Sequence, residues 1–282
     1  MSNDSMTALL ACPVCQSDLS RQDNNLCCAQ GHSFDRAKQG YWNLLLSHKK
    51  KSKDPGDNAG MVQSRRAFLD QGHYTQLSDQ VNQLILANLP ADTAQILDMG
   101  CGEGFYTAAL EQALTDAGRQ DQLIGLDISK HAVKAACSRS KSIEWLVASG
   151  ANIPVPDNSL DVLTVLFSRL MPEAFAKPLK QDGLLLLAWT GEQHLIELRE
   201  LIYDEVRPSG YDPVKQLESA FELQSITEVN YGFALHDNPS IQTLLGMTPH
   251  SQRMAQAKRE QFAQLEQLNL TLDVKLGLFR RR

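Results

Sequence analysis

The first 32 residues contain a group of side chains that could bind a metal ion. Six cysteines occupy positions 12, 15, 27, 28, 101 and 137. Cys12 and Cys15 form a CPVC knuckle, and Cys28 is followed after three residues by His32. Two such pairs, separated by a hairpin-sized loop, can place three thiolates and one imidazole at the corners of a tetrahedron, the geometry of a structural zinc site. The spacing to His32 favours Cys28 over Cys27 as the third thiolate.

This pattern predicts a structural metal rather than a catalytic one, because four protein ligands leave no open coordination position. A module of about 30 residues buries too little surface to fold unaided, so zinc binding would fold it. The alternative is a small core of reduced thiols without metal. A measurement of about one zinc per chain would favour the first interpretation over the second.

A second group of residues, Asp98 to Gly104 (DMGCGEG), joins a predicted strand to a predicted helix. Glycines here allow a tight turn and a close approach of the backbone to a ligand. Asp98 could hold the ammonium of an amino-acid-bearing ligand but would repel a pyrophosphate. Asp127, at the end of the next predicted strand, could accept both hydroxyls of a ribose. A ligand that has a ribose and an ammonium but no pyrophosphate fits S-adenosylmethionine. We expect this cofactor to contact Asp98, Gly100, Gly102 and Asp127.

Strands and helices alternate from about residue 92 onward, which predicts an α/β fold with a doubly wound sheet. We expect parallel strands at residues 95–98, 122–127, 143–148, 160–167 and 183–189, and an antiparallel edge at 222–235 and 270–279. Helices are expected at residues 105–117, 130–140 and 192–206, and helical spacing from about 59 to 89 is broken at 71–73.

Charge is distributed unevenly along the chain. The net charge of −6 argues weakly against a nucleic-acid partner. The segment from Ser33 to Arg66, however, contains eight basic and three acidic residues, and local neutralisation of phosphates is what drives polyanion binding. A solvated lysine loop is the alternative. The candidate RNA-binding residues are Lys49, Lys50, Lys51, Lys53, Arg65 and Arg66.

The amino-acid composition limits the classes of protein to which the chain can belong. With 43% hydrophobic and 21% charged residues, the chain has ordinary globular usage, which excludes a disordered or fibrous protein. The longest apolar run, Leu184 to Trp189, is too short to span a membrane, and the N-terminus lacks the pattern of a secretory signal. We therefore expect a cytoplasmic protein without a membrane partner.

The glycine loop and two later segments resemble the class I methyltransferases. Residues 153–161 (IPVPDNSLD) are similar to the segment before the fourth strand of those enzymes, and residues 179–185 (LKQDGLL) to the turn before the fifth. The resemblance implies a Rossmann-like class I fold with a mostly parallel seven-stranded sheet and an antiparallel edge. A small N-terminal zinc-binding module would be added to that fold.

The joint pattern along nearly the whole chain is more specific. The CPVC knuckle, DPGD at 54–57, RRAFLDQGHY at 65–74, LDMGCGEGFYT at 97–107 and HLIEL at 194–198 resemble the bacterial 23S rRNA (guanine-N1)-methyltransferases. The resemblance implies a homodimer, zinc at the four ligands named above, and methyl transfer to N1 of a guanine in a hairpin loop of domain II of the rRNA. It also implies cofactor contacts at Tyr74, Gly102, Glu103 and His194.

This organisation assigns a role to each part of the chain. Residues 1–53 would form the zinc-binding module and a basic segment for RNA recognition, residues 54–91 a helical linker, and residues 92–282 the methyltransferase domain. Methyl transfer needs alignment more than acid catalysis, and Tyr74 could offer a cation–π face to the sulfonium. The N1 proton of guanine must also be accepted, for which Asp57, His73 and Glu173 are candidates on charge alone.

One segment departs from the family pattern. Members carry an aromatic-Ala-Pro-Cys segment after the fourth strand, where this chain has Phe167 to Pro172 (FSRLMP). Because this region contacts the target base in the family, a catalytically altered RNA-binding factor is one alternative. A small-molecule methyltransferase with a structural zinc knuckle is another. A dehydrogenase is disfavoured, because residues 105 and 106 are Phe and Tyr where a dinucleotide fingerprint has its third glycine.

Overall fold

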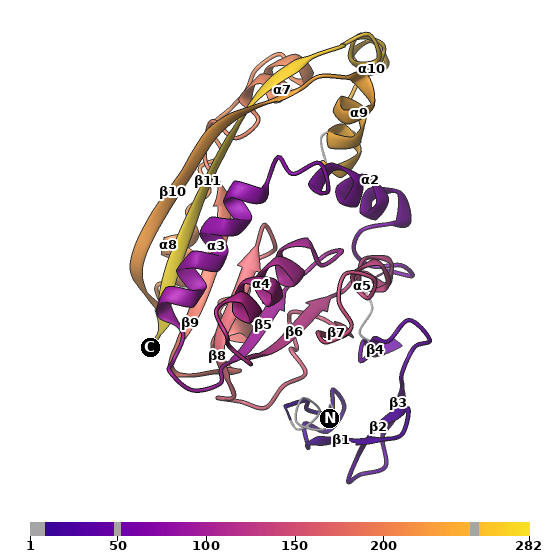
Figure 1. Cartoon of the computed structure of the whole chain (residues 1–282), viewed down its shortest axis with the longest axis vertical. Helices are drawn as coiled ribbons and strands as arrows, with labels where there is room; N and C mark the ends of the chain where they lie inside the picture. The colour runs from indigo at the N-terminus through magenta and orange to yellow at the C-terminus, as the bar shows by residue number, and fades with distance from the viewer. Residues whose placement is uncertain (1–8, 48–51, 249–253) are drawn as a thin grey trace.

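The computed structural model describes residues 9–47, 52–248 and 254–282. In these residues an eight-stranded mixed sheet forms the centre of the molecule, in the order β10-β11-β9-β8-β5-β6-β7-β4 (Figure 1). Its strands are β4 (Trp42–Asn43), β5 (Gln95–Met99), β6 (Gln122–Asp127), β7 (Glu144–Val147), β8 (Leu160–Leu166), β9 (Leu179–Thr190), β10 (Phe221–Leu235) and β11 (Leu268–Arg281). Strands β4 to β9 are parallel, while β11 pairs antiparallel with both β9 and β10.

This sheet confirms the predicted fold class. Its seven long strands have the expected mostly parallel arrangement with an antiparallel edge. Strands β5 to β8 are rich in leucine, isoleucine and valine and are almost wholly buried, as a parallel sheet covered on both faces requires. The eighth strand, β4, is only two residues long and extends the sheet beyond β7.

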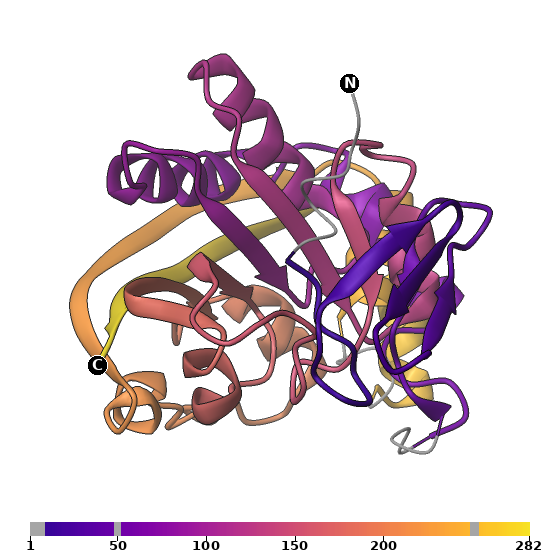
Figure 2. The ribbon, with the colours of Figure 1, turned by 90° about the horizontal axis from the view of Figure 1, so that it is seen from below.

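Helices lie on both faces of the sheet. They are α2 (Ala59–Leu69), α3 (Thr75–Asn88), α4 (Phe105–Asp116), α5 (Lys130–Ala136), α6 (Pro172–Ala176), α7 (Ile196–Ile202), α8 (Pro213–Leu217), α9 (Asn238–Met247) and α10 (Gln256–Ala263). Phe175 of α6 and Leu217 of α8 belong to the hydrophobic cluster of one face. Apolar side chains of α3, α4 and α5 pack with Ile96, Leu123 and Val162 in a second cluster on the other face. Figure 2 shows α3 and α4 together on this side.

The N-terminal module packs on the opposite face. Its strands β1 (Leu19–Gln22), β2 (Asn25–Cys28) and β3 (Ser33–Asp35) form a small antiparallel sheet. Leu19 and Leu26 of this sheet belong to the same hydrophobic cluster as Leu97 and Leu126 of the central sheet. The connection from β7 to β8 contains no helix among its described residues 148–159, and the Ala11 N–H donates to the Pro154 carbonyl at 2.9 Å. The module therefore covers sheet surface that a crossover helix covers elsewhere in α/β proteins.

Two parts of the fold differ from the sequence prediction. The helix expected at 192–206 is shorter, because Leu195 has a left-handed backbone (φ 50°) and α7 ends before the extended Tyr203. Helices α9 and α10 lie between β10 and β11, where no element was predicted. Helix α9 packs closely on α2: a β-carbon added to Gly246 would lie 2.5 Å from Ser64 Oγ. None of the described helices has the length and apolarity needed to cross a membrane.

Candidate cofactor and metal sites

The fold brings the four predicted metal ligands together. Donor atoms of Cys12, Cys15, Cys28 and His32 all lie within 4.8 Å of one another. The Cys28 Sγ is 3.2 Å from His32 Nδ1 and 3.6 Å from Cys15 Sγ. Three thiolates and one imidazole are the donor set that tetrahedral zinc prefers, so the residues present fit the ion.

The environment of the cluster favours a thiolate at Cys28. Burial raises the pKa of this thiol, but hydrogen bonds from the His32 backbone and ring and from the Gln30 backbone outweigh it, and the pKa falls to about 6. Metal ligands must be deprotonated, so this arrangement prepares the site for a cation. Cys27 belongs to a different set of contacts, because its thiol pairs with Ser33 Oγ at 3.5 Å.

The predicted glycine loop connects β5 to α4. The Gly102 N–H donates to Asp127 Oδ2 at 3.0 Å, which ties the loop to the end of β6. Gly104 caps α4 with a left-handed backbone (φ 85°), and a β-carbon there would lie 2.8 Å from the Trp145 ring. A side chain at this position would therefore be strained and would clash, which explains why the chain has glycine there.

Asp98 lies beneath this loop in a buried polar network. Its two carboxylate oxygens accept hydrogen bonds from Thr107 Oγ1 at 2.5 Å and from Thr164 Oγ1 at 2.7 Å. Burial raises the pKa of Asp98, and these two hydrogen bonds oppose the rise. The structure thus adds two hydroxyl partners that the sequence pattern did not reveal. Binding of a cofactor ammonium by Asp98 stays a prediction.

Glu103 is buried in a second network at the start of α4. Its Oε2 accepts a hydrogen bond from Arg139 Nε at 2.6 Å, and Arg139 Nη2 donates to Asp70 Oδ1 at 2.7 Å. The other oxygen, Oε1, is buried without a hydrogen-bond partner among the described residues. An unpaired buried carboxylate oxygen is costly, and a ligand donor would satisfy it. This oxygen supports the cofactor contact that the resemblance implies at Glu103.

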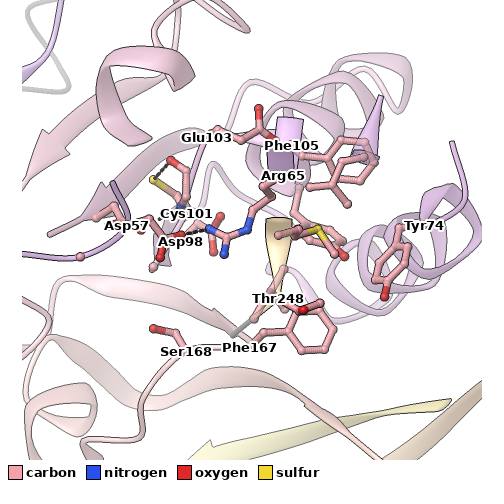
Figure 3. A pocket seen from close by; sticks show the side chains of 18 of the residues that line it. Asp57, Arg65, Tyr74, Asp98, Cys101, Glu103, Phe105, Phe167, Ser168 and Thr248 are labelled. Carbon is pink, nitrogen blue, oxygen red and sulfur yellow. Dashed lines mark hydrogen bonds and ion pairs between the residues drawn. The ribbon is translucent and has the colours of Figure 1, made fainter. Parts of the chain in front are cut away.

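These residues line a cavity of about 560 Å³, here called the cofactor cavity (Figure 3). It lies at the carboxyl ends of β5, β6, β8 and β9, the usual ligand position in open α/β sheets. Its walls are Gly56, Asp57, Arg65, Leu69, Tyr74, Asp98, Gly100, Cys101, Gly102, Glu103, Phe105, Tyr106, Asp127, Leu166, Phe167, Ser168, Thr190, His194, Leu195, Met247 and Thr248. All seven predicted cofactor residues are in this set.

Tyr74 and His194 meet at one wall of the cofactor cavity. The Tyr74 hydroxyl lies 3.4 Å from His194 Nε2, and the two rings are perpendicular. The Asp273 backbone N–H donates to His194 Nδ1 at 3.3 Å. In neutral His194, Nδ1 is therefore the acceptor, and Nε2 carries the proton that faces Tyr74. Burial also raises the pKa of Tyr74 well above its ordinary value, so the phenol keeps its proton.

The linker from residue 54 to 91 also contributes to the cavity. Asp57 and Arg65 form an ion pair within its walls. The turn that carries Asp57 is fixed to the start of α5, where Ser129 Oγ donates to the Asp57 carbonyl at 2.6 Å. Arg65 was predicted as an RNA contact; the structure places it in the cavity wall with the predicted cofactor residues, and its role in RNA binding stays a prediction.

The three candidate proton acceptors occupy different environments. His73 stacks on Phe233 with ring centroids 5.1 Å apart, and burial lowers the pKa of its imidazole. Glu173 is exposed on α6. Neither is part of the cofactor cavity, whereas Asp57 is, with its carboxylate held by Arg65.

Three of the six predicted RNA-binding residues lie in the described part of the chain. Lys49, Lys50 and Lys51 lie outside the described residues, and Lys53 is exposed. Arg66 donates to the Ala135 carbonyl at 3.2 Å and to Ser138 Oγ at 2.7 Å, so it joins α2 to α5. Its role in RNA binding stays a prediction.

Several residues of the cavity wall were not predicted from the sequence. Met247 and Thr248 come from the end of α9, an element without a predicted counterpart. Phe167 follows β8 with a left-handed backbone (φ 56°) and a 42% exposed ring at the cavity wall. The N-cap signal Asp237-Asn238-Pro239 at the start of α9 could have revealed that helix, because Asp237 caps it and Pro is favoured in the first turn.

Two family models match separate parts of the chain. A zinc-ribbon family model described as "RlmA, N-terminal" matches residues 10–53, and a methyltransferase-domain model matches residues 96–181. A Micromonospora griseorubida protein that carries the name of a 23S rRNA (guanine-N1)-methyltransferase is 30% identical over 232 residues, covering 76% of this chain and 75% of that protein. The chain belongs to the 23S rRNA (guanine-N1)-methyltransferase family.

Two further relatives of this family extend the comparison. A Bacillus subtilis protein with the same name is 28% identical over 275 residues, covering 95% of each chain. The 23S rRNA (guanine(748)-N(1))-methyltransferase of Streptomyces fradiae is 31% identical over 191 residues, covering 67% of this chain and 66% of that protein. The chain is thus an S-adenosylmethionine-dependent methyltransferase with an N-terminal zinc ribbon (residues 10–53), as predicted from its motifs.

Proposed function

We propose that this methyltransferase modifies N1 of a guanine in a hairpin loop of domain II of 23S rRNA. The observation that carries the proposal is that similarity to the Bacillus subtilis relative spans 95% of both chains. The shared length therefore includes both the zinc ribbon and the cofactor cavity. A small-molecule methyltransferase would need only the second of these.

The cavity supports such a reaction through its own residues. S-Adenosylmethionine supplies a methyl group on a positively charged sulfonium, which electron-rich aromatic faces and carboxylates attract. Tyr74 offers an aromatic ring at the wall, and Gly102, Glu103 and Asp127 offer the loop and carboxylates to hold the nucleoside. Because methyl transfer requires alignment, we assign these residues to binding and orientation.

The exposed ring of Phe167 supports a nucleobase as the acceptor. Its backbone is held in a left-handed conformation, which is costly for a residue with a side chain and is seen mainly at functional sites. Recognition of single-stranded RNA relies on bases splayed out and stacked on aromatic side chains. Phe167 would thus supply a stacking surface despite the altered segment from 167 to 172.

The zinc ribbon and the basic segment after it would bind the rRNA phosphates. The attachment of the zinc ribbon to the central sheet, through Leu19, Leu26 and the Ala11–Pro154 hydrogen bond, supports a fixed position of the ribbon relative to the cavity. A fixed distance between phosphate contacts and the cavity would select which base reaches it.

We assign no side chain as the acceptor of the guanine N1 proton. Asp57 lies at the cavity wall, but its carboxylate is already engaged by the Arg65 guanidinium. A pH–rate profile of Asp57→Asn would test the residue directly: loss of an acidic limb, with the maximum rate reduced at least about a hundredfold, would assign it as the base.

The resemblance also leads us to propose a homodimer and a cytoplasmic location. Sedimentation equilibrium of the purified protein, with and without an rRNA hairpin, tests the first. Fractionation of cells that express a tagged chain tests the second. A monomer that methylates rRNA at full rate would contradict the dimer and leave the substrate proposal intact.

Mapping of N1-methylguanine tests the function itself. This modification blocks base pairing and stops reverse transcriptase, so rRNA from cells with and without the gene should differ at one guanine. The purified protein should also methylate a hairpin transcript and fail on the same hairpin with that guanine replaced by adenine. Cofactor binding and hairpin binding without any methyl transfer would instead favour the non-catalytic RNA-binding factor.

A further inference from the structure

The charges in the cofactor cavity are strongly unbalanced. Four carboxylates line it, from Asp57, Asp98, Glu103 and Asp127. Among the described residues of its walls, Arg65 is the only lysine or arginine. Glu103 is already neutralised by Arg139. The remaining acids suit a sulfonium and an ammonium, but they would repel the carboxylate at the amino-acid end of the cofactor.

Arg65 lies where it can remove that repulsion. Its Nη1 is 3.8 Å from the position of a β-carbon built on Gly102, so the guanidinium faces the glycine loop. Figure 3 shows the Arg65 side chain reaching into the space between Asp57, Cys101 and Glu103. The ion pair with Asp57 uses Nη1. A guanidinium has five N–H donors in a planar fork, so donors remain for a second carboxylate.

We infer that Arg65 binds the carboxylate of the cofactor's amino-acid end, and that Asp57 positions the guanidinium for this contact. The inference rests on the proposed use of S-adenosylmethionine in this cavity. It gives Arg65 a role in cofactor selection rather than in RNA binding. A ligand without the carboxylate would leave the guanidinium with Asp57 as its carboxylate partner and its remaining donors unused over the glycine loop.

Asp57 is suited to hold Arg65 because its own backbone is fixed. The Asp57 carbonyl accepts the Ser129 hydroxyl, and a β-carbon on Gly56 would lie 2.8 Å from the Ser129 side chain. Ser129 also donates its backbone N–H to Asp127 Oδ1 at 2.7 Å. Ser129 therefore links Asp127, which would bind the ribose, to Asp57, which would orient Arg65.

Two cofactors that differ only in the carboxylate give a direct test. Calorimetry would measure binding of S-adenosylmethionine and of decarboxylated S-adenosylmethionine to the full-length wild type and to Arg65→Gln. We expect the wild type to prefer the carboxylated form about tenfold to a hundredfold, as a charge-assisted hydrogen-bond pair provides. Arg65→Gln should lose most of that preference while keeping its affinity for the decarboxylated form.

The neighbouring arginine provides a matched control. Arg66→Gln removes the same charge from the same helix, but Arg66 contacts α5 rather than the cavity, so the preference should be unchanged. Asp57→Asn should reduce the preference less than Arg65→Gln does. Combining the two substitutions should give no further loss, because Asp57 acts through Arg65.

Three results would overturn the inference. Equal loss of affinity for both cofactors in Arg65→Gln would show that the residue only supports the cavity wall. An unchanged preference would mean that backbone N–H groups of the glycine loop hold the carboxylate. A wild type that binds neither cofactor would remove the proposed function as well. In contrast, a normal carboxylate preference without guanine methylation would refute the RNA substrate and leave Arg65 assigned.

Discussion

The carboxylate of Asp127 accepts a hydrogen bond from the backbone N–H of Gly102 at 3.0 Å. This contact joins the ends of the two adjacent parallel strands β5 and β6 across the glycine loop. It fixes the loop conformation from the side on which the ribose would lie. The same carboxylate thus has a structural partner and is the one that we expect to bind the ribose.

We predict that Asp127→Ala weakens S-adenosylmethionine binding by roughly 1–3 kcal/mol, because hydroxyls of the ribose would lose their acceptor. Calorimetric titration measures the change. Asp116→Ala, an exposed carboxylate at the far end of α4, provides the control and should bind as the wild type does. Unchanged affinity in Asp127→Ala would refute our placement of the ribose.

We predict that Cys28→Ser abolishes stoichiometric zinc binding, whereas the adjacent Cys27→Ser retains about one zinc per chain. The reason is geometric: Cys28 lies with the other donors, and Cys27 pairs with Ser33. Elemental analysis of the purified variants measures the metal. Zinc loss in Cys27→Ser, with Cys28→Ser normal, would reverse the ligand assignment.

Zinc loss should also destabilise the methyltransferase domain. Cys12 and Cys28 share a hydrophobic cluster with Leu97 and Leu126 of the central sheet, so an unfolded ribbon would expose that sheet face. We expect chelation to lower the melting temperature of the whole chain in one transition. Two separate transitions, with the upper one unchanged by chelator, would show that the modules fold independently.

We predict a pH-dependent stability effect from Glu144, which is 3% exposed and accepts a hydrogen bond from Trp42 Nε1. Burial raises the pKa of this carboxyl; the Trp42 hydrogen bond, Arg36 and Arg21 oppose the rise without cancelling it. The folded state therefore keeps a proton that the unfolded chain releases near pH 4.5. As pH rises through that window, this group lowers the free energy of unfolding.

Glu144→Gln removes that titration while keeping an oxygen for Trp42. Relative to the wild type, its free energy of unfolding should rise, by an amount on the order of 1 kcal/mol, as pH increases from about 4 to about 7. Urea unfolding at a series of pH values measures this difference. Glu222→Gln, at an exposed position of β10, should show no such trend. A difference that is constant with pH would contradict the prediction.

We predict that replacing Lys49, Lys50 and Lys51 with alanine lowers affinity for an rRNA hairpin and leaves cofactor affinity unchanged. For each lysine–phosphate ion pair that the substitutions remove, the slope of log affinity against log salt should become shallower by about 0.7 to 0.9. Binding at several salt concentrations measures the slope. If neither affinity nor slope moves, the lysines form only a solvated loop.

The four predicted zinc ligands and the order of the predicted cofactor-binding segments could be read directly from the amino-acid sequence. Cys12, Cys15, Cys28 and His32 lie close in sequence, so their spacing alone limits the geometry that they can adopt. Ligands bind at the carboxyl ends of parallel strands. This rule predicts a ligand at the loop from Asp98 to Gly104 and at Asp127, and both lie at the cavity. Buried β5 to β8 were also visible as continuous apolar runs.

Which side chains from remote parts of the chain meet became visible in the folded structure alone. Arg65 reaches the cavity because α2 packs between α5 and α9, and charge alone could not distinguish it from Arg66, which faces α5. His73 and Tyr74 are adjacent in sequence, yet only Tyr74 lines the cavity. Local spacing fixes local ligand geometry, whereas the direction in which a helix presents each side chain depends on packing with elements that are remote in sequence.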